Sequence, residues 1–204
     1  GNWRQRHKWK RKGGLLSAFL SLALCFLVCY DTLVKVSELG GTILERKDVL
    51  IPAEDLARQR DFQEKIRSMF ASRQAHPRAC VDTFGCQQNV ADGQKLMGML
   101  QECGFTLTDE PKEADLVILN TCAIREHAEQ RVLGNVGALV HGKRRNPEQI
   151  ICLCGCMARE QHVADKLRQS YRHVDLVFGP QVLWRFPELL RRVYLRRGRV
   201  FETG

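Results

Sequence analysis

The chain has 204 residues and the composition of a globular protein, and this length allows one ordinary domain with additional segments. Its formal net charge is +9, of which residues 1–12 carry six, and the remaining +3 permits an anionic partner such as RNA without requiring one. The nine cysteines are an odd number, which argues against a disulfide scaffold and favours metal or redox use in a reducing, cytoplasmic compartment.

Residues 1–30 combine a basic segment with an apolar one. Eighteen uncharged, mostly apolar residues (13–30) meet the lower limit of about 17 residues for a membrane-spanning helix. A basic flank before an apolar run also resembles a signal peptide, although no convincing cleavage site follows. Either reading would carry the rest of the chain into an oxidising space that is unsuited to metal-binding thiolates. We therefore expect no membrane partner. Residues 1–30 are left as a possible membrane segment or a non-native leader.

Residues 31–77 are predicted to form a linker followed by an amphipathic helix. Leu56, Phe62, Ile66 and Phe70 recur at near-helical spacing among many charged residues between positions 52 and 74. This pattern is typical of a helix that docks on a larger domain.

Residues 78–195 are predicted to form the main domain. The expected strands cover 79–84, 105–108, 115–119, 149–153 and 174–178, and the expected helices cover 90–103, 125–141, 158–169 and 182–193. This order predicts an α/β fold with a doubly wound, mostly parallel sheet of the Rossmann or flavodoxin type, preceded by N-terminal helical segments. The first methionine is Met69, and the last residues, 199–204, bring no helix or strand to completion, so we expect a piece of a longer protein in which 196–204 open a linker.

Three cysteines follow predicted strands. Cys86 comes just after the first strand, and Cys122 and Cys156 each come three residues after a buried apolar strand. Ligands of open parallel sheets bind outside the carboxyl ends of the strands, so we expect these cysteines to be neighbours although 36 and 34 residues separate them. Three thiolates suit a 4Fe–4S cluster and leave one iron without a protein ligand. Helices starting after Cys122 and Cys156 would stabilise such an anionic group.

The other cysteines are predicted to be packing residues or incidental. Buried core positions are expected for Cys80, Cys103, Cys152 and Cys154. Alternation along the strand puts Cys152 and Cys154 on the side of Cys156, which leaves either open as a fourth ligand. Cys25 and Cys29 have the spacing that opens a CxxxCxxC motif, but the third position is Thr32.

Two other kinds of site fit the sequence less well. Structural zinc sites commonly use paired C-x2–4-C ligands, and no such pair occurs among the three cysteines. A dinucleotide-binding domain would need a G-x-G-x-x-G motif between the first strand and helix, which is missing. A non-enzymatic reading stays open: a membrane-tethered α/β interaction module with incidental cysteines.

Basic residues are predicted to lie on solvated faces, with phosphate contact as the alternative. This applies to residues 143–145 and 191–199. Arg125, Glu126 and Arg131 are interpreted as charge pairing near a helix start, rather than as RNA-binding or cluster-edge residues.

Three segments carry a resemblance to a known family. Residues 83–89 (Thr-Phe-Gly-Cys-Gln-Gln-Asn), 120–126 (Asn-Thr-Cys-Ala-Ile-Arg-Glu) and 155–158 (Gly-Cys-Met-Ala) resemble the N-terminal domain of the methylthiotransferases. These are radical S-adenosylmethionine enzymes with two 4Fe–4S clusters. The resemblance covers about residues 78–195, with Gln88 in place of the common methionine. The middle segment is most similar to the branch that modifies N(6)-dimethylallyladenosine in tRNA.

The resemblance implies a role for the three cysteines. Cys86, Cys122 and Cys156 would bind the auxiliary 4Fe–4S cluster, whose open iron carries the sulfur that becomes a methylthio group on the base beside the anticodon. The implied partner is the anticodon stem-loop of tRNA, and the sulfur and electron donors are unidentified. S-adenosylmethionine and a second cluster would be bound by a missing radical domain, so this fragment is expected to be inactive alone. Two other substrates stay open: threonylcarbamoyladenosine in tRNA and a ribosomal protein.

Overall fold

The computed structural model describes residues 51–123, 128–196 and 198–203. The predicted leader at 1–30, the linker up to residue 50, and Arg125 and Glu126 lie outside these ranges. Among the described helices, none combines the length and the apolar character that a membrane crossing requires.

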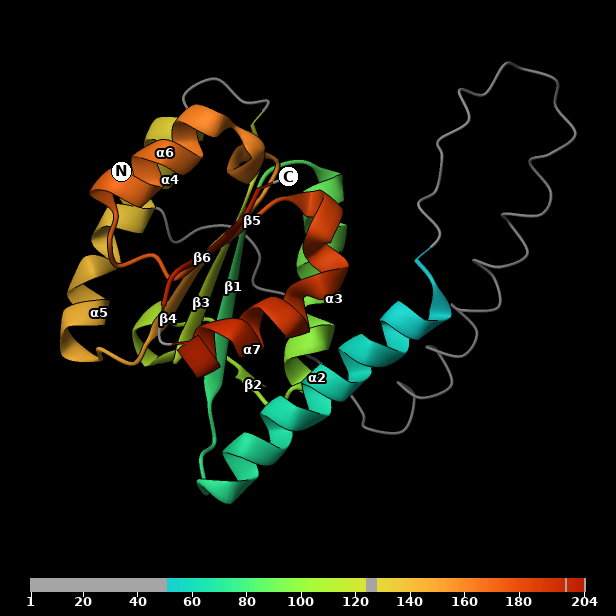
Figure 1. Cartoon of the computed structure of the whole chain (residues 1–204). Coiled ribbons are helices and arrows are strands. Elements are labelled where there is room, and N and C mark those ends of the chain that lie inside the picture. The colour runs from blue at the N-terminus through green and yellow to red at the C-terminus, as the bar shows by residue number, and fades with distance from the viewer. Residues whose placement is uncertain (1–50, 124–127, 197, 204) are drawn as a thin grey trace, which may run out of the picture. The chain divides into compact units, whose positions relative to one another are not determined.

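Six strands form one fully parallel sheet, which confirms the predicted α/β fold (Figure 1). The strands are β1 (Arg78–Phe84), β2 (Thr106–Leu107), β3 (Leu116–Thr121), β4 (Ile150–Gly155), β5 (Leu176–Phe178) and β6 (Val200–Glu202). Their order across the sheet is β2-β1-β3-β4-β5-β6. This is the flavodoxin-like order, in which the winding of the chain reverses between β1 and β3. A ligand is therefore expected outside the carboxyl ends of β1 and β3.

Helices connect the strands and cover both faces of the sheet. The described helices are α2 (Ala53–Ser72), α3 (Gln87–Glu102), α4 (Ala128–Ala138), α5 (Val140–Arg145), α6 (Gln161–Ser170) and α7 (Phe186–Arg196). Short 3-10 turns occur at η1 (Pro111–Glu113), η2 (Cys156–Arg159) and η3 (Pro180–Arg185). In Figure 1, α2, α3 and α7 lie on one side of the sheet, and α4, α5 and α6 lie on the other.

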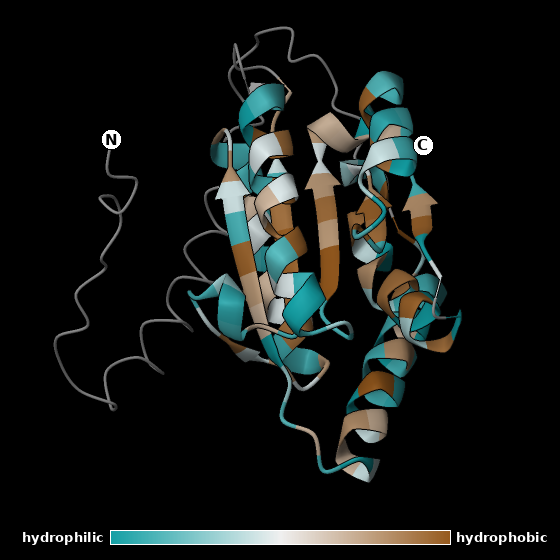
Figure 2. Cartoon of the chain, turned by 90° about the vertical axis from the view of Figure 1, so that its left-hand side faces the viewer, coloured by the Kyte–Doolittle hydropathy of each residue, from teal (hydrophilic) through white to brown (hydrophobic). Residues whose placement is uncertain are grey.

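The core consists of two apolar clusters, one on each face of the sheet. Leu96 of α3 and Phe186 of α7 belong to one cluster, whereas Val132 of α4 and Leu167 of α6 belong to the other. All six residues of β3 and all six of β4 are buried, because these strands contribute side chains to both clusters. Figure 2 shows the apolar strands enclosed by helices that are hydrophilic over much of their surface.

Helix α2 docks on the main domain, as its amphipathic pattern predicts. Ile66 and Phe70 are buried in the cluster formed with α3 and α7. The Phe70 ring meets Phe105 and Tyr194 edge-on, with centroid distances of 5.1 and 5.6 Å. Leu56 is an exception to the prediction, because it is exposed.

Several predicted boundaries near the cysteines are wrong. The helix predicted to begin at residue 90 begins at Gln87, directly after Cys86. The strands predicted to end at 119 and 153 continue to Thr121 and Gly155. Three of the four extra residues are polar or lack a side chain, so the apolar pattern alone misses them, and the fourth is the buried Cys154. As a result, Cys122 and Cys156 follow their strands directly.

The predicted helices beyond residue 124 also differ in detail. The described part of the 125–141 prediction forms two helices, α4 and α5, the second ending at Arg145. Each of the helices predicted at 158–169 and 182–193 is a 3-10 turn followed by an α-helix in the structure: η2 and α6 in the first case, η3 and α7 in the second. Residues 200–202, assigned to the opening of a linker, form β6 and pair with β5.

Candidate functional site

The three predicted site cysteines lie at one edge of the sheet, after three adjacent strands. The register pairs Phe84 of β1 with Thr121 of β3, and Thr121 with Gly155 of β4. Cys122 and Cys156 follow the paired residues directly, and Cys86 follows Phe84 after one intervening glycine. Adjacent strands lie about 4.8 Å apart, so the register alone brings the three cysteine backbones to neighbouring positions.

Cys86 is the N-cap of α3. Its side chain accepts a hydrogen bond from the backbone N–H of Asn89, and the Asn89 side chain accepts one from the Cys86 N–H, at 3.3 Å. The backbone N–H groups of Asn89 and Gln88 and the Cys122 thiol lower the pKa of Cys86. Exposed N–H groups at the start of a helix favour an anion in this position. Cys86 is therefore well placed to carry a thiolate.

Gly85 lets Cys86 and Cys122 approach each other. A β-carbon on Gly85 would lie 2.7 Å from the β-carbon of Cys122, closer than real side chains pack. Cys122 is only 2% exposed, and its thiol is one of the groups that lower the pKa of Cys86. The first two cysteines therefore lie close together just beyond the paired ends of β1 and β3, between which the chain reverses its winding.

Cys156 completes the group from β4. It begins the η2 turn and is half-buried. Partial burial raises its pKa, as do the neighbouring thiols of Cys122 and Cys86. The preceding Gly155 has φ 96°, in the region that favours glycine, and this conformation ends β4 with a sharp turn. The structure thus brings the three predicted residues to neighbouring positions at the ends of adjacent strands.

Within the described ranges, no group of three or more His, Cys, Asp or Glu side chains has the arrangement to hold a single ion. A single zinc ion draws its thiolates to about 2.3 Å from one centre, whereas an iron–sulfur cluster is ligated through separate iron atoms and needs wider spacing. Among the described residues, the three cysteines therefore lie near one another without forming a ready-made site for a single ion.

The expected helix arrangement around the cysteines is partly wrong. Helix starts were predicted after Cys122 and Cys156, but the helix that begins at a cysteine is α3, at Cys86. Cys156 begins a 3-10 turn, and α6 starts five residues later, at Gln161. The residues between Cys122 and α4 include 124–127, which lie outside the described part of the chain.

The remaining described cysteines are buried packing residues, as predicted. Cys80 belongs to one core cluster, and Cys103, Cys152 and Cys154 belong to the other. Burial raises the pKa of Cys80 and Cys103 to about 12, and it also raises those of Cys152 and Cys154 strongly. These neutral, fully enclosed thiols contrast with Cys86 and Cys156, which both retain access to solvent.

Sequence reasoning missed a buried polar group beneath the cysteines. Asn89, Asn120 and Thr121 are at most 2% exposed, although the last two lie in an otherwise apolar strand. Asn89 Nδ2 donates to Asn120 Oδ1 at 3.2 Å, and Asn120 Nδ2 donates to the Asn89 carbonyl at 2.7 Å. Polar residues at the end of a buried strand were the available signal, because buried amides need partners.

Two of the basic residues predicted to lie on solvated faces serve the fold instead. Lys143 Nζ lies 2.8 Å from Asp175 Oδ2, and both side chains are mostly buried. Arg199 donates hydrogen bonds to four backbone carbonyls near the end of α6. Arg131, which was interpreted as charge pairing near a helix start, is exposed. Neither Lys143 nor Arg199 is therefore free to contact phosphate.

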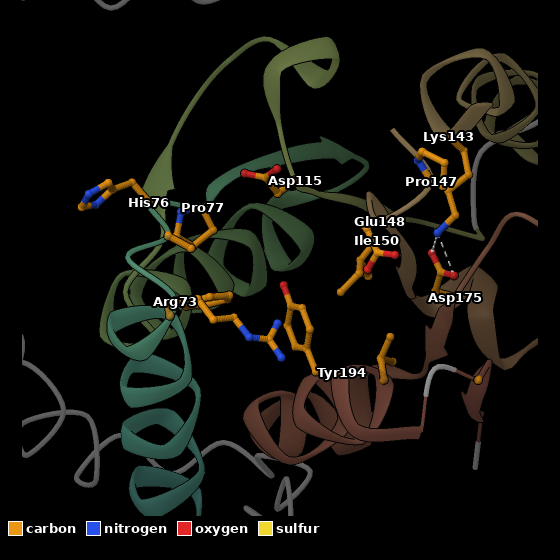
Figure 3. Close-up of a pocket in the computed structure, with 14 residues that line it drawn as sticks. Arg73, His76, Pro77, Asp115, Lys143, Pro147, Glu148, Ile150, Asp175 and Tyr194 are labelled. Carbon is orange, nitrogen blue, oxygen red and sulfur yellow. Dashed lines mark hydrogen bonds and ion pairs between the residues drawn. The ribbon is translucent and has the colours of Figure 1, made fainter. Parts of the chain in front are cut away.

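A cavity of about 580 Å³ lies at the opposite edge of the sheet from the cysteines (Figure 3). Pro77 and Asp115, which precede β1 and β3, line it together with Lys143, Asp175 and Tyr194. Figure 3 shows the Lys143–Asp175 ion pair on one side of the cavity, and the Tyr194 ring next to the Arg73 side chain on the other. Ligands of such sheets bind at the carboxyl edge, so the cavity is separate from the candidate site.

Comparison with known proteins supplies a family and a set of relatives. Residues 78–179 match the uncharacterized protein family UPF0004. A tRNA-2-methylthio-N(6)-dimethylallyladenosine synthase of Acetivibrio thermocellus is 41% identical over 150 residues, which cover 72% of this chain and 31% of the relative. A synthase of the same name from Alkaliphilus oremlandii is 40% identical over 159 residues, covering 78% and 33%.

A third relative with that name, from Clostridioides difficile, is 43% identical over 150 residues, covering 72% of this chain and 31% of the relative. The chain thus spans about a third of the length of the curated relatives that it matches. The family match contains Cys86, Cys122 and Cys156.

Proposed function

The chain belongs to protein family UPF0004, and from that premise we propose that it is the N-terminal, cluster-binding part of a tRNA methylthiotransferase. The names of its relatives support N(6)-dimethylallyladenosine as the modified base, rather than threonylcarbamoyladenosine or a ribosomal protein. Because the chain spans about a third of those relatives, the complete reaction belongs to a longer protein.

One observation carries this proposal: three cysteines from three adjacent strands gather where the sheet reverses its winding. The register Phe84–Thr121–Gly155 aligns the ends of β1, β3 and β4. In this fold the same edge receives the ligand. Four other described cysteines are buried in the core, so the clustering is selective.

The residues of this edge suit a 4Fe–4S cluster with three protein ligands. Cys86, Cys122 and Cys156 would hold it, and it would supply an iron without a cysteine ligand, from which sulfur is delivered to the base. The helix N-terminus at Cys86 favours the thiolate form that ligation requires. Because Gly85 and Gly155 have no side chain, the backbone beside Cys86 and Cys156 can lie close to the neighbouring residues of this edge.

The remaining parts of the reaction would lie outside the described domain. We propose that the longer protein binds S-adenosylmethionine and a second 4Fe–4S cluster, and that tRNA is its substrate through the anticodon stem-loop. A cytoplasmic location fits both the substrate and the reduced thiols. The sulfur donor and the electron donor are unidentified.

Reconstitution of the 204-residue chain tests the proposal. After anaerobic incubation with iron and sulfide, we expect about four irons per chain and broad visible absorbance. Cys86→Ala, Cys122→Ala and Cys156→Ala should each abolish the full cluster, because each removes one of three ligands. The matched control is Cys103→Ala, which changes a buried core cysteine and should leave the iron content unchanged.

Two outcomes would contradict the proposal. A chain that binds no iron would favour an interaction module with incidental cysteines. A Cys122→Ala variant that still carries four irons would show that the ligand set is wrong. In the full-length protein, loss of methylthio transfer to tRNA in the three variants would link the cluster to the reaction.

A further inference from the structure

The cysteine-bearing strand ends are joined by buried side-chain hydrogen bonds. Asn89 Oδ1 accepts from the Cys86 N–H, at 3.3 Å, and Asn89 Nδ2 donates to the Thr121 carbonyl, at 3.1 Å. Thr121 Oγ1 donates to the Cys154 carbonyl of β4, at 2.8 Å. One continuous series of contacts therefore runs from the Cys86 turn through β3 to β4.

Each contact in this series lies next to a candidate ligand. Asn89 bonds Cys86 itself, Thr121 directly precedes Cys122, and Cys154 lies two residues before Cys156. Asn120 adds a second connection between α3 and β3, because its side chain accepts from Asn89 Nδ2 and donates to the Asn89 backbone carbonyl. None of these side chains faces solvent, so water cannot replace the bonds without opening the site.

We propose that Asn89 and Thr121 are positioning residues that fix the spacing of the three thiols before a cluster is bound. This inference rests on the proposed function and extends it from the ligands to the residues that hold them. An amide is required at position 89, because the side chain must accept from Cys86 and donate to Thr121 at once. The prearranged thiols then bind the cluster without first ordering three chain segments.

The test measures how fast a reconstituted cluster loses iron to a chelator under anaerobic conditions. Asn89→Asp keeps the acceptor for Cys86 but replaces the donor toward the Thr121 carbonyl with an acceptor. Thr121→Val is nearly the same shape and removes only the hydroxyl bond to β4. Replacing a residue that holds a metal ligand in place typically weakens metal affinity about 10–100-fold. We therefore expect both variants to lose iron at least about tenfold faster than wild type.

Two controls separate positioning from stability and charge. Leu100→Ala lowers stability at the far end of the same helix, where Leu100 is fully buried in the core. Gln87→Glu adds a negative charge like that of Asn89→Asp, at an exposed position in the same turn. Both should lose iron at the wild-type rate. Thermal unfolding of each cluster-free variant shows how much stability the substitution itself removes.

The outcomes distinguish this inference from the function on which it rests. If wild type binds a cluster and Thr121→Val and Asn89→Asp release iron at its rate, the positioning role is overturned and the proposed function stands. If Leu100→Ala releases iron as fast as they do, the effect is one of stability and the inference is again overturned. If Asn89→Asp does not fold, Thr121→Val decides. A wild-type chain without a cluster overturns both proposals.

Discussion

At the scale of single residues, Gly155 is the most constrained backbone position near the cysteines. Its φ of 96° and ψ of −168° lie in a region that is essentially restricted to glycine. A β-carbon there would lie 2.8 Å from the backbone nitrogen of Thr121 and 2.9 Å from Asn120 Oδ1. Backbone strain and crowding therefore act together on any larger residue, directly beside Cys156.

Replacing Gly155 with alanine should lower the free energy of unfolding by about 2–3 kcal/mol, because the strained backbone alone costs about 1–3 kcal/mol. Denaturant titration of the cluster-free chain measures the change. The control is Gly134→Ala in α4, where an added β-carbon meets open space. That change should be neutral or stabilise by up to about 1 kcal/mol. Equal effects at both glycines would contradict the account.

The candidate ligands could be identified from the sequence, but the residues that we propose position them could not. Cys86, Cys122 and Cys156 stand out because thiolate chemistry and strand ends point to the same positions. Asn89 and Thr121 lie in the same motifs, yet a polar residue after a strand is equally typical of a helix cap or a turn. Their role depends on which strands are neighbours, and that is a property of the folded chain.

At the scale of elements, Arg199 joins the start of β6 to the end of α6. Its guanidinium donates to the carbonyls of Leu167, Arg168, Tyr171 and Val174, at 2.7–3.1 Å. The last carbonyls of a helix have no partner within the helix, so a cation that bonds them stabilises that end. Arg199 thereby connects the short strand β6 to α6, which covers the same face of the sheet as α4 and α5.

Arg199→Ala should lower the free energy of unfolding by about 2 kcal/mol, since hydrogen bonds to charged groups contribute about 1.5–3 kcal/mol. Arg172→Ala removes a neighbouring, exposed arginine and should change stability by less than about 0.5 kcal/mol. Thermal or denaturant unfolding compares the two. A loss of stability as large for Arg172→Ala would mean that general charge, not the bonds to α6, explains the effect.

Elements were predictable where their apolar pattern is long. β3 and β4 appear in the sequence as continuous apolar runs, and α2 shows helical spacing over five turns. β6 has three residues, too few for a period, and its place depends on pairing with β5. Helix starts at cysteines were also misplaced, because the Cys86 cap replaces the residues that usually signal a helix N-terminus.

At the scale of the whole molecule, the sheet order creates the site. Alternating strands and helices predict a parallel sheet, but not that β1, β3 and β4 are consecutive neighbours. That order places Cys86 and Cys122 on either side of the winding reversal, with Cys156 one strand further. Cys86, Cys122 and Cys156, which are separated by 36 and 34 positions in the sequence, thus lie at one edge of the sheet.

The most direct test of this account follows the alkylation of each cysteine in the wild-type chain by mass spectrometry, before and after anaerobic cluster loading. We predict that in the cluster-free chain half-exposed Cys86 reacts readily and half-exposed Cys156 reacts more slowly, because its pKa is raised, and that both become protected once the cluster is bound. Removing the iron should restore both reactions, while buried Cys103 stays unreactive throughout. If Cys86 and Cys156 react equally before and after iron and sulfide are taken up, the three cysteines do not bind the cluster.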